Sequence, residues 1–206
     1  MITLYYSPAT ASMVVHWLLI DLGIPHQIHL VDIDKQQNKT AEYLRLNPAG
    51  VIPTLDLDGQ VITEAAAITM HLGDLHNLAP APGTPARAAY YQWMFFMANT
   101  LQPHYRAWFY PTEPAGEGSV GAAKEQARLR IEAAWARVET HLAAGGPYLL
   151  GELTAADFML TMLMRWSRNM PRPAHTHPAL GACAARMKAR PSWKRLYEVE
   201  GLTEWA

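Results

Sequence analysis

The 206-residue sequence contains a single cysteine, Cys183, and has almost no net charge. One cysteine cannot form an internal disulfide bond, which agrees with a reducing compartment. The formal net charge of −1 gives no electrostatic basis for binding nucleic acid or an anionic membrane. The opening residues contain neither a basic segment nor a long apolar run, so the sequence predicts no signal peptide and no membrane span. We therefore expect a cytoplasmic protein without nucleic-acid or membrane partners.

Half of the residues are hydrophobic, which is enough for a substantial folded core. Residues 78–85 form the one proline-rich break in the chain. Before this break the pattern mixes strands with helices, and after it the pattern is purely helical. The sequence therefore predicts a first domain at residues 1–77, a linker at 78–85 and an all-helical domain at 86–206.

The predicted first domain has alternating strand and helix signals. Apolar periodicity and turn residues predict, in chain order, a strand at 2–6, a helix at 13–22, a strand at 27–31, a short helix at 41–46, a hairpin turning at 58–59 and a helix of about ten residues after position 64. This βαβ-α-ββα order resembles the thioredoxin fold. Thioredoxin-type redox chemistry needs a thiolate at the start of the first helix, and no cysteine lies there. We therefore expect an α/β, thioredoxin-like fold without the redox activity.

The predicted second domain is helical throughout. Residues 86–100 are apolar and aromatic almost all round, which indicates a helix buried on several sides, and Pro103 kinks or interrupts it. Residues 122–143 form a long amphipathic helix pattern. Its buried residues are expected to include Leu129, Ala133, Ala136 and Val138. Thr154 and Asp157 have the spacing of a capping box, which predicts the start of a further helix.

The most specific stretch of the sequence lies at residues 46–55 and continues at 63–68. Pro53 stands at the mouth of a strand, where proline is tolerated as the first strand residue or after a cis peptide bond. A cis bond would turn the backbone groups of Ile52 outward, where they could pair with an extended peptide ligand. The helix that begins at 63–68 has free amide groups that would attract a carboxylate, while Glu64 would attract an ammonium group. One helix end could therefore hold both charges of an α-amino acid.

The pattern Asn-Pro-x-Gly-x-Ile-Pro-x-Leu, followed by Thr-Glu-x-x-Ala-Ile, resembles the glutathione-binding half of the glutathione S-transferase family. The capping box also recurs in the second domain of that family, so the resemblance spans the chain. It is closest to bacterial members of the beta and zeta classes. The resemblance implies that Ile52, before the cis-proline Pro53, hydrogen-bonds the cysteinyl backbone of glutathione, while Glu64 and Ala65 hold its γ-glutamyl end. Many members have serine where this chain has Ala65, so one hydroxyl hydrogen bond is lost, about 1 kcal/mol.

Three further residues become candidates for glutathione contacts through the resemblance. Lys35 and Lys39 could meet the glycine carboxylate of glutathione, although exposed lysines are usually just solvated. Gln102 matches a glutamine that helps bind glutathione in zeta-class enzymes. A solvated glutamine at a helix kink explains Gln102 about as well.

Catalysis in this family requires the glutathione thiol to ionise, which a hydroxyl donor and a helix N-terminus favour. The beta-class cysteine position falls on Ala11 in this chain, and the zeta- and theta-class serine falls on or next to Ala9. Thr10 is the nearest hydroxyl, so we rank it first, followed by Ser12 and Tyr6. Ser12 has an alternative role as the N-cap of the first helix. Because Tyr6 and its neighbour at position 5 face opposite sides of a strand, at most one of them can reach the predicted glutathione-binding cleft.

An electrophile pocket is predicted near the helix interruption in the second domain. The residues that could line it are His104, Arg106, Trp108 and Trp166. Their aromatic rings and charge would suit an aromatic or acidic substrate, with arginine holding a carboxylate. Core packing explains the tryptophans equally well. The nine histidines show no metal-ligand spacing, so no metal is expected.

The sequence thus predicts a glutathione S-transferase that uses glutathione as co-substrate and conjugates or isomerises a small hydrophobic or aromatic electrophile. The family resemblance implies a homodimer and a role in detoxification. The alternative is a non-catalytic binding or regulatory protein that keeps the fold without turnover. The alanines at positions 9, 11 and 65 favour this alternative, because each stands where a catalytic or binding side chain occurs in the family.

Overall fold

The computed structural model describes residues 1–205, which divide into two compact units. The first unit comprises Met1–Ala79 and the segment from Lys188 onward, and the second comprises Pro80–Met187. The division after Ala79 falls inside the proline-rich segment 78–85.

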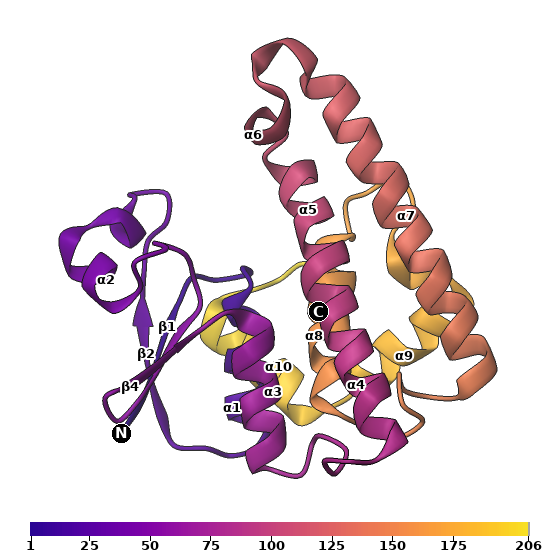
Figure 1. Ribbon diagram of the computed structural model, residues 1–206, viewed down its shortest axis with the longest axis horizontal. Helices are drawn as coiled ribbons and strands as arrows, with labels where there is room; N and C mark the ends of the chain where they lie inside the picture. The colour runs from indigo at the N-terminus through magenta and orange to yellow at the C-terminus, as the bar shows by residue number, and fades with distance from the viewer. Residues whose placement is uncertain (206) are drawn as a thin grey trace. The chain divides into compact units, whose positions relative to one another are not determined.

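A four-stranded sheet with the order β2-β1-β3-β4 forms the centre of the first unit (Figure 1). Strand β1 (Ile2–Tyr6) lies parallel to β2 (His26–Leu30) and antiparallel to β3 (Thr54–Leu57), which pairs antiparallel with β4 (Gln60–Thr63). The helices of this part are α1 (Ser12–Asp21), α2 (Ala41–Leu46) and α3 (Ala65–Leu75), with a short 3-10 turn at Gln37–Lys39. The thioredoxin-like order predicted from the sequence is confirmed.

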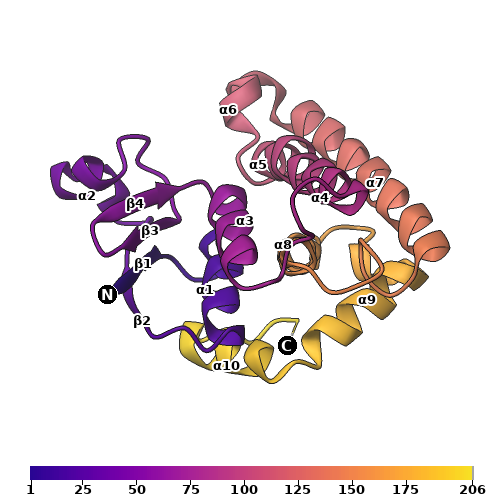
Figure 2. The same ribbon diagram turned by 60° about the horizontal axis from the view of Figure 1, so that its bottom comes forward.

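Adjacent residues of β1 mark the two faces of the sheet. The ring of Tyr6 lies 5.5 Å from the ring of His16 on α1, whereas the ring of Tyr5 lies 6.1 Å from that of Tyr43 on α2. Because neighbouring strand residues point in opposite directions, α1 and α2 cover opposite faces. Helix α3 packs beside α1 (Figure 2).

The last helix, α10 (Pro191–Glu200), packs against α1 although it lies at the other end of the chain (Figure 2). The indole N–H of Trp17 donates to the hydroxyl of Ser192 at 2.9 Å, and Arg190 forms an ion pair with Asp21 at 2.7 Å. The ring of Trp193 lies 4.7 Å from that of Trp17. These contacts place α10 in the core of the first unit, whereas the sequence-based extent of the helical domain, 86–206, stays a prediction.

The second unit is helical within the part of the chain that the structure describes, as expected. Its helices are α4 (Pro85–Phe96), α5 (Gln102–Phe109), α6 (Thr112–Ala115), α7 (Val120–Gly145), α8 (Ala155–Trp166) and α9 (Pro178–Lys188), with 3-10 turns at Glu117–Ser119 and Ala174–Thr176. Helix α5 runs along α7, and the indole N–H of Trp135 donates to the buried hydroxyl of Tyr105 at 3.0 Å (Figure 1).

Helix α4 is less buried than expected. Tyr91 is 39% and Phe95 57% exposed. Of the two alternatives predicted at Pro103, a kink or an interruption, the interruption is wrong, because the helix passes through a π-helical segment, Met97–Leu101, into α5. The N–H of Gln102 donates to the carbonyl of Met97, five residues earlier. This wider turn accommodates a proline that cannot donate a backbone hydrogen bond.

The buried face of α7 was predicted wrongly for three of four residues. Val138 is buried, but Leu129, Ala133 and Ala136 are exposed. The face that packs inward consists of Ala127, Ile131, Ala134, Trp135, Val138 and Leu142. Alanines lie on several sides of this helix, and a small side chain has little preference for burial, so the apolar pattern did not define one face.

The predicted capping box at the start of α8 is confirmed. The Asp157 carboxylate accepts from the N–H of Thr154 at 2.8 Å, and the Thr154 side chain caps the helix in return. Asp157 also accepts from the N–H of Leu149 at 2.9 Å, a contact that the sequence did not predict. Burial raises the pKa of the Asp157 carboxyl to about 6.

Candidate functional site

The peptide bond between Ile52 and Pro53 is cis, the second of the two forms considered from the sequence. Pro53 directly precedes β3. Within residues 1–205, the backbone N–H and C=O of Ile52 have no hydrogen-bond partner. An extended ligand could therefore pair with these two groups without displacing a bond of the protein.

The loop before Ile52 is held by buried side chains. Asn47 donates to the carbonyl of Val51 at 2.8 Å and to the hydroxyl of Thr54 at 3.1 Å. Its Oδ1 accepts from the N–H of Ala49 at 3.1 Å. The hydroxyl of Tyr43, on α2, donates to the same Val51 carbonyl at 2.8 Å. Helix α2 and Asn47 thus fix the position of the residue next to Ile52.

Gly50 is the tightest point of this loop. Its φ is +59°, and a Cβ there would lie 2.8 Å from Nζ of Lys39 and 2.9 Å from the carbonyl oxygen of Asn38. The carbonyl of Gly50 accepts from Nδ2 of Asn38 at 2.8 Å and from Nζ of Lys39 at 2.9 Å. Only glycine fits, because any Cβ would be strained by the backbone and crowded by Asn38.

Glu64 occupies the N-cap of α3 with φ +69° and ψ 114°. A residue other than glycine costs about 1–3 kcal/mol in such a conformation, and this cost is typical of functional sites. The Glu64 side chain is exposed and has no partner within residues 1–205. No side chain caps α3, so the N–H groups at Ala65 and Ala66 have no capping acceptor. A free carboxylate beside free N–H donors suits a zwitterionic ligand.

The turn between β1 and α1 brings the hydroxyls of Thr10 and Ser12 together at the backbone of Ser7. The Ser12 hydroxyl accepts from the N–H of Ser7 at 3.2 Å and donates to the Ser7 carbonyl at 3.0 Å. The Thr10 hydroxyl donates to the same carbonyl at 2.7 Å and lies 2.9 Å from the Ser12 hydroxyl. Ser7 and Ser12 are buried, and only Thr10 is partly exposed.

The structure assigns Ser12 a different role from the predicted alternative. Ala11 is the N-cap of α1, and no side chain caps this helix. Ser12 instead closes the turn onto Ser7. Tyr6 is buried against α1, and burial followed by the charge of Glu200 raises the pKa of its hydroxyl. The three catalytic candidates lie in the first unit and differ in access to solvent. Thr10 is partly exposed, whereas Ser12 and Tyr6 are buried.

The lysine candidates both have partners in the protein. Lys35 forms an exposed ion pair with Asp32 at 2.8 Å. This pair lowers the pKa of Asp32 and raises that of Lys35. Lys39 is bound to the Gly50 carbonyl described above. Either lysine would have to leave these partners to meet a ligand carboxylate.

The predicted electrophile-pocket residues make separate contacts in the second unit. Arg106 forms a two-point ion pair with Glu113, one bond of which measures 2.7 Å. Nζ of Lys124, on α7, lies 4.6 Å from the ring centre of Trp108. The other two pocket residues have different surroundings. His104 is half-buried on α5, and burial and then Arg130 lower its pKa. Trp166 meets the rings of Tyr105 and Phe109 edge-on. Gln102, the glutathione-contact candidate, is half-buried on α5. These contacts do not bring the four predicted residues into one cluster.

Several residues that build the site were missed from the sequence. Asn47, Tyr43 and Asn38 hold the loop before Ile52, and Glu200 of α10 contacts the turn that carries Thr10. Asn47 is the first residue of the Asn-Pro-x-Gly pattern, so a structural role for its side-chain amide could have been predicted from the sequence. Glu200 lies 191 residues from its partner Ala9, and nothing local indicates that contact.

No set of three or more His, Cys, Asp or Glu side chains in residues 1–205 is arranged to hold a metal ion. Over the same residues, none of the helices combines the length and apolar character needed to cross a membrane.

Known proteins resemble this chain over nearly its whole length. Residues 10–75 match the family model for the glutathione S-transferase N-terminal domain, and residues 121–198 match that for the C-terminal domain. Glutathione S-transferase GST-4.5 of Xanthomonas campestris pv. campestris is 30% identical over 204 residues, which cover 97% of this chain and 98% of that protein. The structure of a glutathione S-transferase from Xylella fastidiosa is 28% identical with a TM-score of 0.89, over 98% of this chain and 100% of that one. A sphingomonad glutathione S-transferase complexed with glutathione is 27% identical with a TM-score of 0.84, at the same coverage.

Proposed function

The chain belongs to the glutathione S-transferase family, and from this premise we propose that it binds glutathione in the first unit, ionises its thiol and transfers the sulfur to a small electrophile. The same activated thiol would serve an isomerisation. The observation that carries the proposal is the exposed Glu64 at the uncapped start of α3, held in a backbone conformation that is costly for any residue but glycine. We also propose that the first unit up to residue 77 is the glutathione-binding domain.

Glutathione binding is proposed to use main chain at one end and charge at the other. The N–H and C=O of Ile52, after the turn fixed by Asn47, pair with the cysteinyl residue in the manner of a strand. Glu64 accepts from the γ-glutamyl ammonium, and the N–H of Ala65 donates to the γ-glutamyl carboxylate. The glycine carboxylate is assigned to the loop that carries Lys35, and Gln102 stays a further proposed contact.

Thr10 is the proposed donor to the glutathione thiolate. The Ser12 proton can satisfy the buried Ser7 carbonyl by itself, since Ser12 lies 3.0 Å from that oxygen. The Thr10 proton is then free to turn from the same carbonyl toward a sulfur atom, without leaving a buried acceptor unpaired. The start of α1, which has no side-chain cap, adds a favourable dipole for a negative charge.

The proposed electrophile is small and hydrophobic or aromatic. Trp166 and Phe109 present ring edges and faces to each other, and Phe109 is 48% exposed. Arg106 is occupied by Glu113, so an acidic substrate would first have to break that ion pair. We further propose a cytoplasmic homodimer that acts in detoxification. The exposed aromatic side chains of Tyr91 and Phe95 on α4 are apolar surface of the kind that assembly buries.

A second candidate function is a binding protein that retains glutathione without turnover. The positions nearest the expected nucleophile-activating residue are Ala9 and Ala11, and two of the three hydroxyls in this turn are buried. If Thr10 cannot reach the sulfur, no other exposed hydroxyl in the turn replaces it.

Two measurements on the full chain separate these functions. Calorimetry with glutathione measures binding, and an absorbance assay with a chlorinated dinitrobenzene measures conjugation. We expect both to be positive for the transferase, whereas binding without conjugation would identify the second function. The Glu64→Gln variant should bind glutathione about tenfold more weakly, because it loses a charge-assisted hydrogen bond. Glu42→Gln, on α2, is the matched control and should leave the affinity unchanged. Equal affinities of both variants would contradict the proposed site.

A further inference from the structure

A cavity of about 540 Å³ lies between α2 and the sheet, entirely within the first unit. Its volume is within the range of small-molecule sites. Tyr5 of β1 lines it, whereas Tyr6 faces α1, so the cavity is on the opposite face of the sheet from α1. It shares no lining residue with the proposed glutathione contacts at Ile52, Pro53, Glu64 and Ala65.

The walls of the cavity are aromatic and apolar. The ring of Tyr5 lies 5.0 Å from that of His29 on β2 and 6.1 Å from that of Tyr43 on α2. Leu30, which is 52% exposed, and Leu46 complete this surface. An apolar group of a ligand would therefore cover side chains that are now in contact with water, which is favourable.

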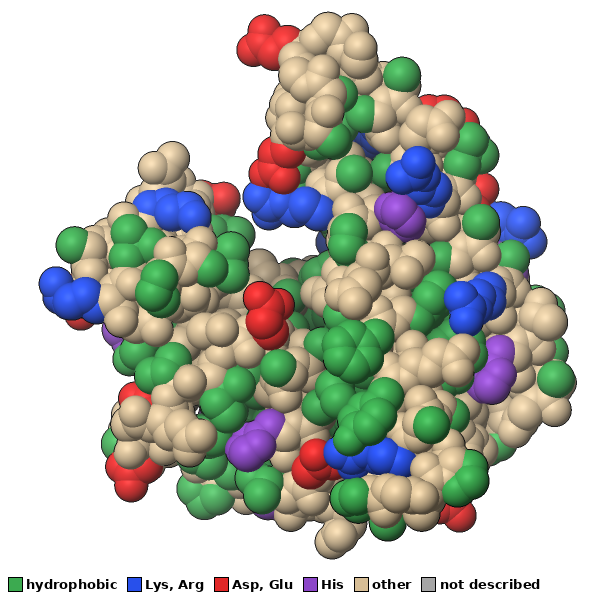
Figure 3. All heavy atoms as spheres, viewed as in Figure 1, with side chains coloured by type: hydrophobic (Ala, Val, Ile, Leu, Met, Phe, Trp, Pro, Cys, Tyr) green, Lys and Arg blue, Asp and Glu red, His purple; other side chains and the backbone are tan. Residues whose placement is uncertain are grey.

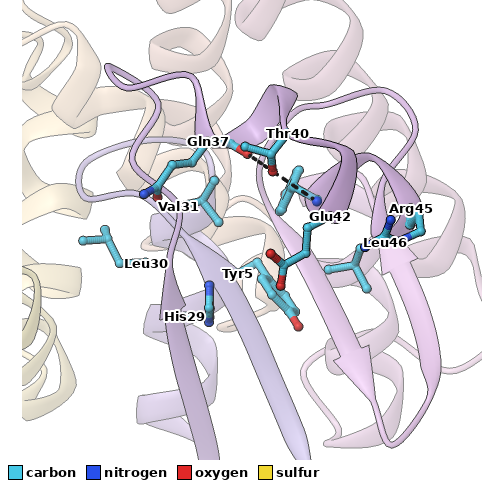
Figure 4. Close-up of a pocket in the computed structure, with 10 residues that line it drawn as sticks. Tyr5, His29, Leu30, Val31, Gln37, Thr40, Glu42, Arg45 and Leu46 are labelled. Atoms are coloured by element: carbon cyan, nitrogen blue, oxygen red, sulfur yellow. Dashed lines mark hydrogen bonds between the residues drawn. The ribbon is translucent and has the colours of Figure 1, made fainter.

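Four polar side chains of the cavity have no hydrogen-bond or ion-pair partner within the described residues 1–205. They belong to Tyr5, His29, Glu42 and Arg45. Glu42 extends from α2 toward Tyr5 and His29, whereas Arg45 extends away from them (Figure 4). Other polar side chains of the lining are bonded within the protein. The Thr40 hydroxyl donates to the carbonyl of Gln37 at 2.9 Å, and Oε1 of Gln37 accepts from the N–H of Asp32 at 2.8 Å.

We propose that this cavity is a second ligand site, which takes a small primary amine carrying an aromatic or branched apolar group. The ammonium group donates to the Glu42 carboxylate and to the Tyr5 oxygen, and the apolar group packs against Leu30, Leu46 and the Tyr5 ring. An ammonium near this ring also gains from its negative face. An anion is disfavoured because, of the charged side chains Glu42 and Arg45 in the lining, the Glu42 carboxylate is directed toward the rings and Arg45 is directed away from them (Figure 4).

Figure 3 shows one face of the molecule, over which charged side chains are scattered where solvent screens them. Glu42 is exposed as well, and it differs from such side chains because it lines the cavity together with Tyr5 and His29. The site does not depend on the proposed glutathione chemistry.

The test compares three probes with the same phenyl group, namely 2-phenylethylamine, 2-phenylethanol and 3-phenylpropionate. Binding to the full chain, isotopically labelled and saturated with glutathione, is followed by backbone amide chemical shifts. We expect the amine to bind at least about tenfold more tightly than the alcohol and the anion, as a charge-assisted hydrogen bond predicts. Its shifts should lie at residue 5, residues 29–31 and residues 40–46.

The variants decide between the two sites. Glu42→Gln should weaken the amine about tenfold and leave glutathione binding unchanged, whereas Glu64→Gln should do the reverse. Glu42 is exposed, so the substitution should not disturb folding. Equal binding of amine and alcohol, or an amine affinity that falls with Glu64→Gln and not with Glu42→Gln, would overturn the proposal. Neither outcome would bear on whether the protein conjugates glutathione.

Discussion

The side chain of Glu200 connects the last helix to the turn after the first strand, since its Oε2 accepts from the N–H of Ala9 at 3.0 Å. Its Oε1 lies 2.8 Å from Nδ1 of His16, and both of these side chains are buried. Ala9 has φ +61°, a conformation that non-glycine residues rarely adopt. Glu200 therefore stabilises a strained turn and, through it, the position of Thr10.

We expect Glu200→Ala to lower the free energy of unfolding by about 2–4 kcal/mol, because it removes a buried acceptor of two hydrogen bonds. Urea denaturation would measure the change. Glu198→Ala on the same helix is the control, since Glu198 forms only an exposed pair with Arg195 at 3.4 Å and should change stability by less than about 0.5 kcal/mol. Similar losses in both variants would show that the contact with Ala9 has no special weight.

Local sequence signals predicted the first unit well and long-range contacts poorly. The strand Ile2–Tyr6 and the helix Ala41–Leu46 were predicted to the residue, and the capping box of Thr154 and Asp157 was confirmed. Each of these depends on neighbours within a few positions. The contact between Glu200 and Ala9 joins residues that are 191 positions apart, and neither hydrophobic periodicity nor a local motif predicts it.

The sequence motif predicted the residues that face a ligand, but it did not predict the side chains that hold these residues in place. The residues that face a ligand, Ile52 and Glu64, stand within the recognised motif. The side chains that hold the loop before Ile52, such as Tyr43 on α2, lie on a different element, and no local pattern distinguishes them from ordinary core residues. In α7 the many alanines gave no single apolar face, so burial was misassigned even where the helix itself was predicted correctly.

A second prediction concerns pH and the buried Asp157. Its pKa is raised from 3.8 to about 6, mainly by burial, so the folded state binds a proton more tightly than the unfolded state does. Its contribution to stability is therefore greatest at low pH and declines by about 3 kcal/mol as pH rises through its window from 3.8 to about 6. The free energies of unfolding of the wild type and Asp157→Asn should be measured across this range. Their difference should fall as pH rises, and a difference independent of pH would contradict the assignment.

A third prediction tests the crowding at Gly50. Gly50→Ala should lower the free energy of unfolding by about 2 kcal/mol and weaken glutathione binding, because the added Cβ strains the backbone and meets Asn38. Gly23→Ala is the matched control, since Gly23 has φ +63° against +59° for Gly50, and a Cβ there meets nothing within 4 Å. The control should show the backbone cost alone, about 1 kcal/mol, with normal glutathione affinity. Equal effects would mean that the loop before Ile52 can give way.

The last prediction concerns the proton of Thr10. Thr10→Val keeps the shape of the side chain but removes the donor, so the thiolate of bound glutathione loses a hydrogen bond while the buried bonds between Ser12 and Ser7 remain. The pKa of the bound thiol should rise by about one unit, and kcat/KM at neutral pH should fall about tenfold. Titration of the thiolate absorbance, with glutathione saturating, measures the pKa apart from binding. Thr10→Ser restores a hydroxyl and should recover most of the loss, whereas Ser12→Ala should mainly destabilise the turn. A thiol pKa that is the same in the wild type and in Thr10→Val would remove Thr10 from the mechanism and leave the backbone N–H groups at the start of α1 to hold the sulfur.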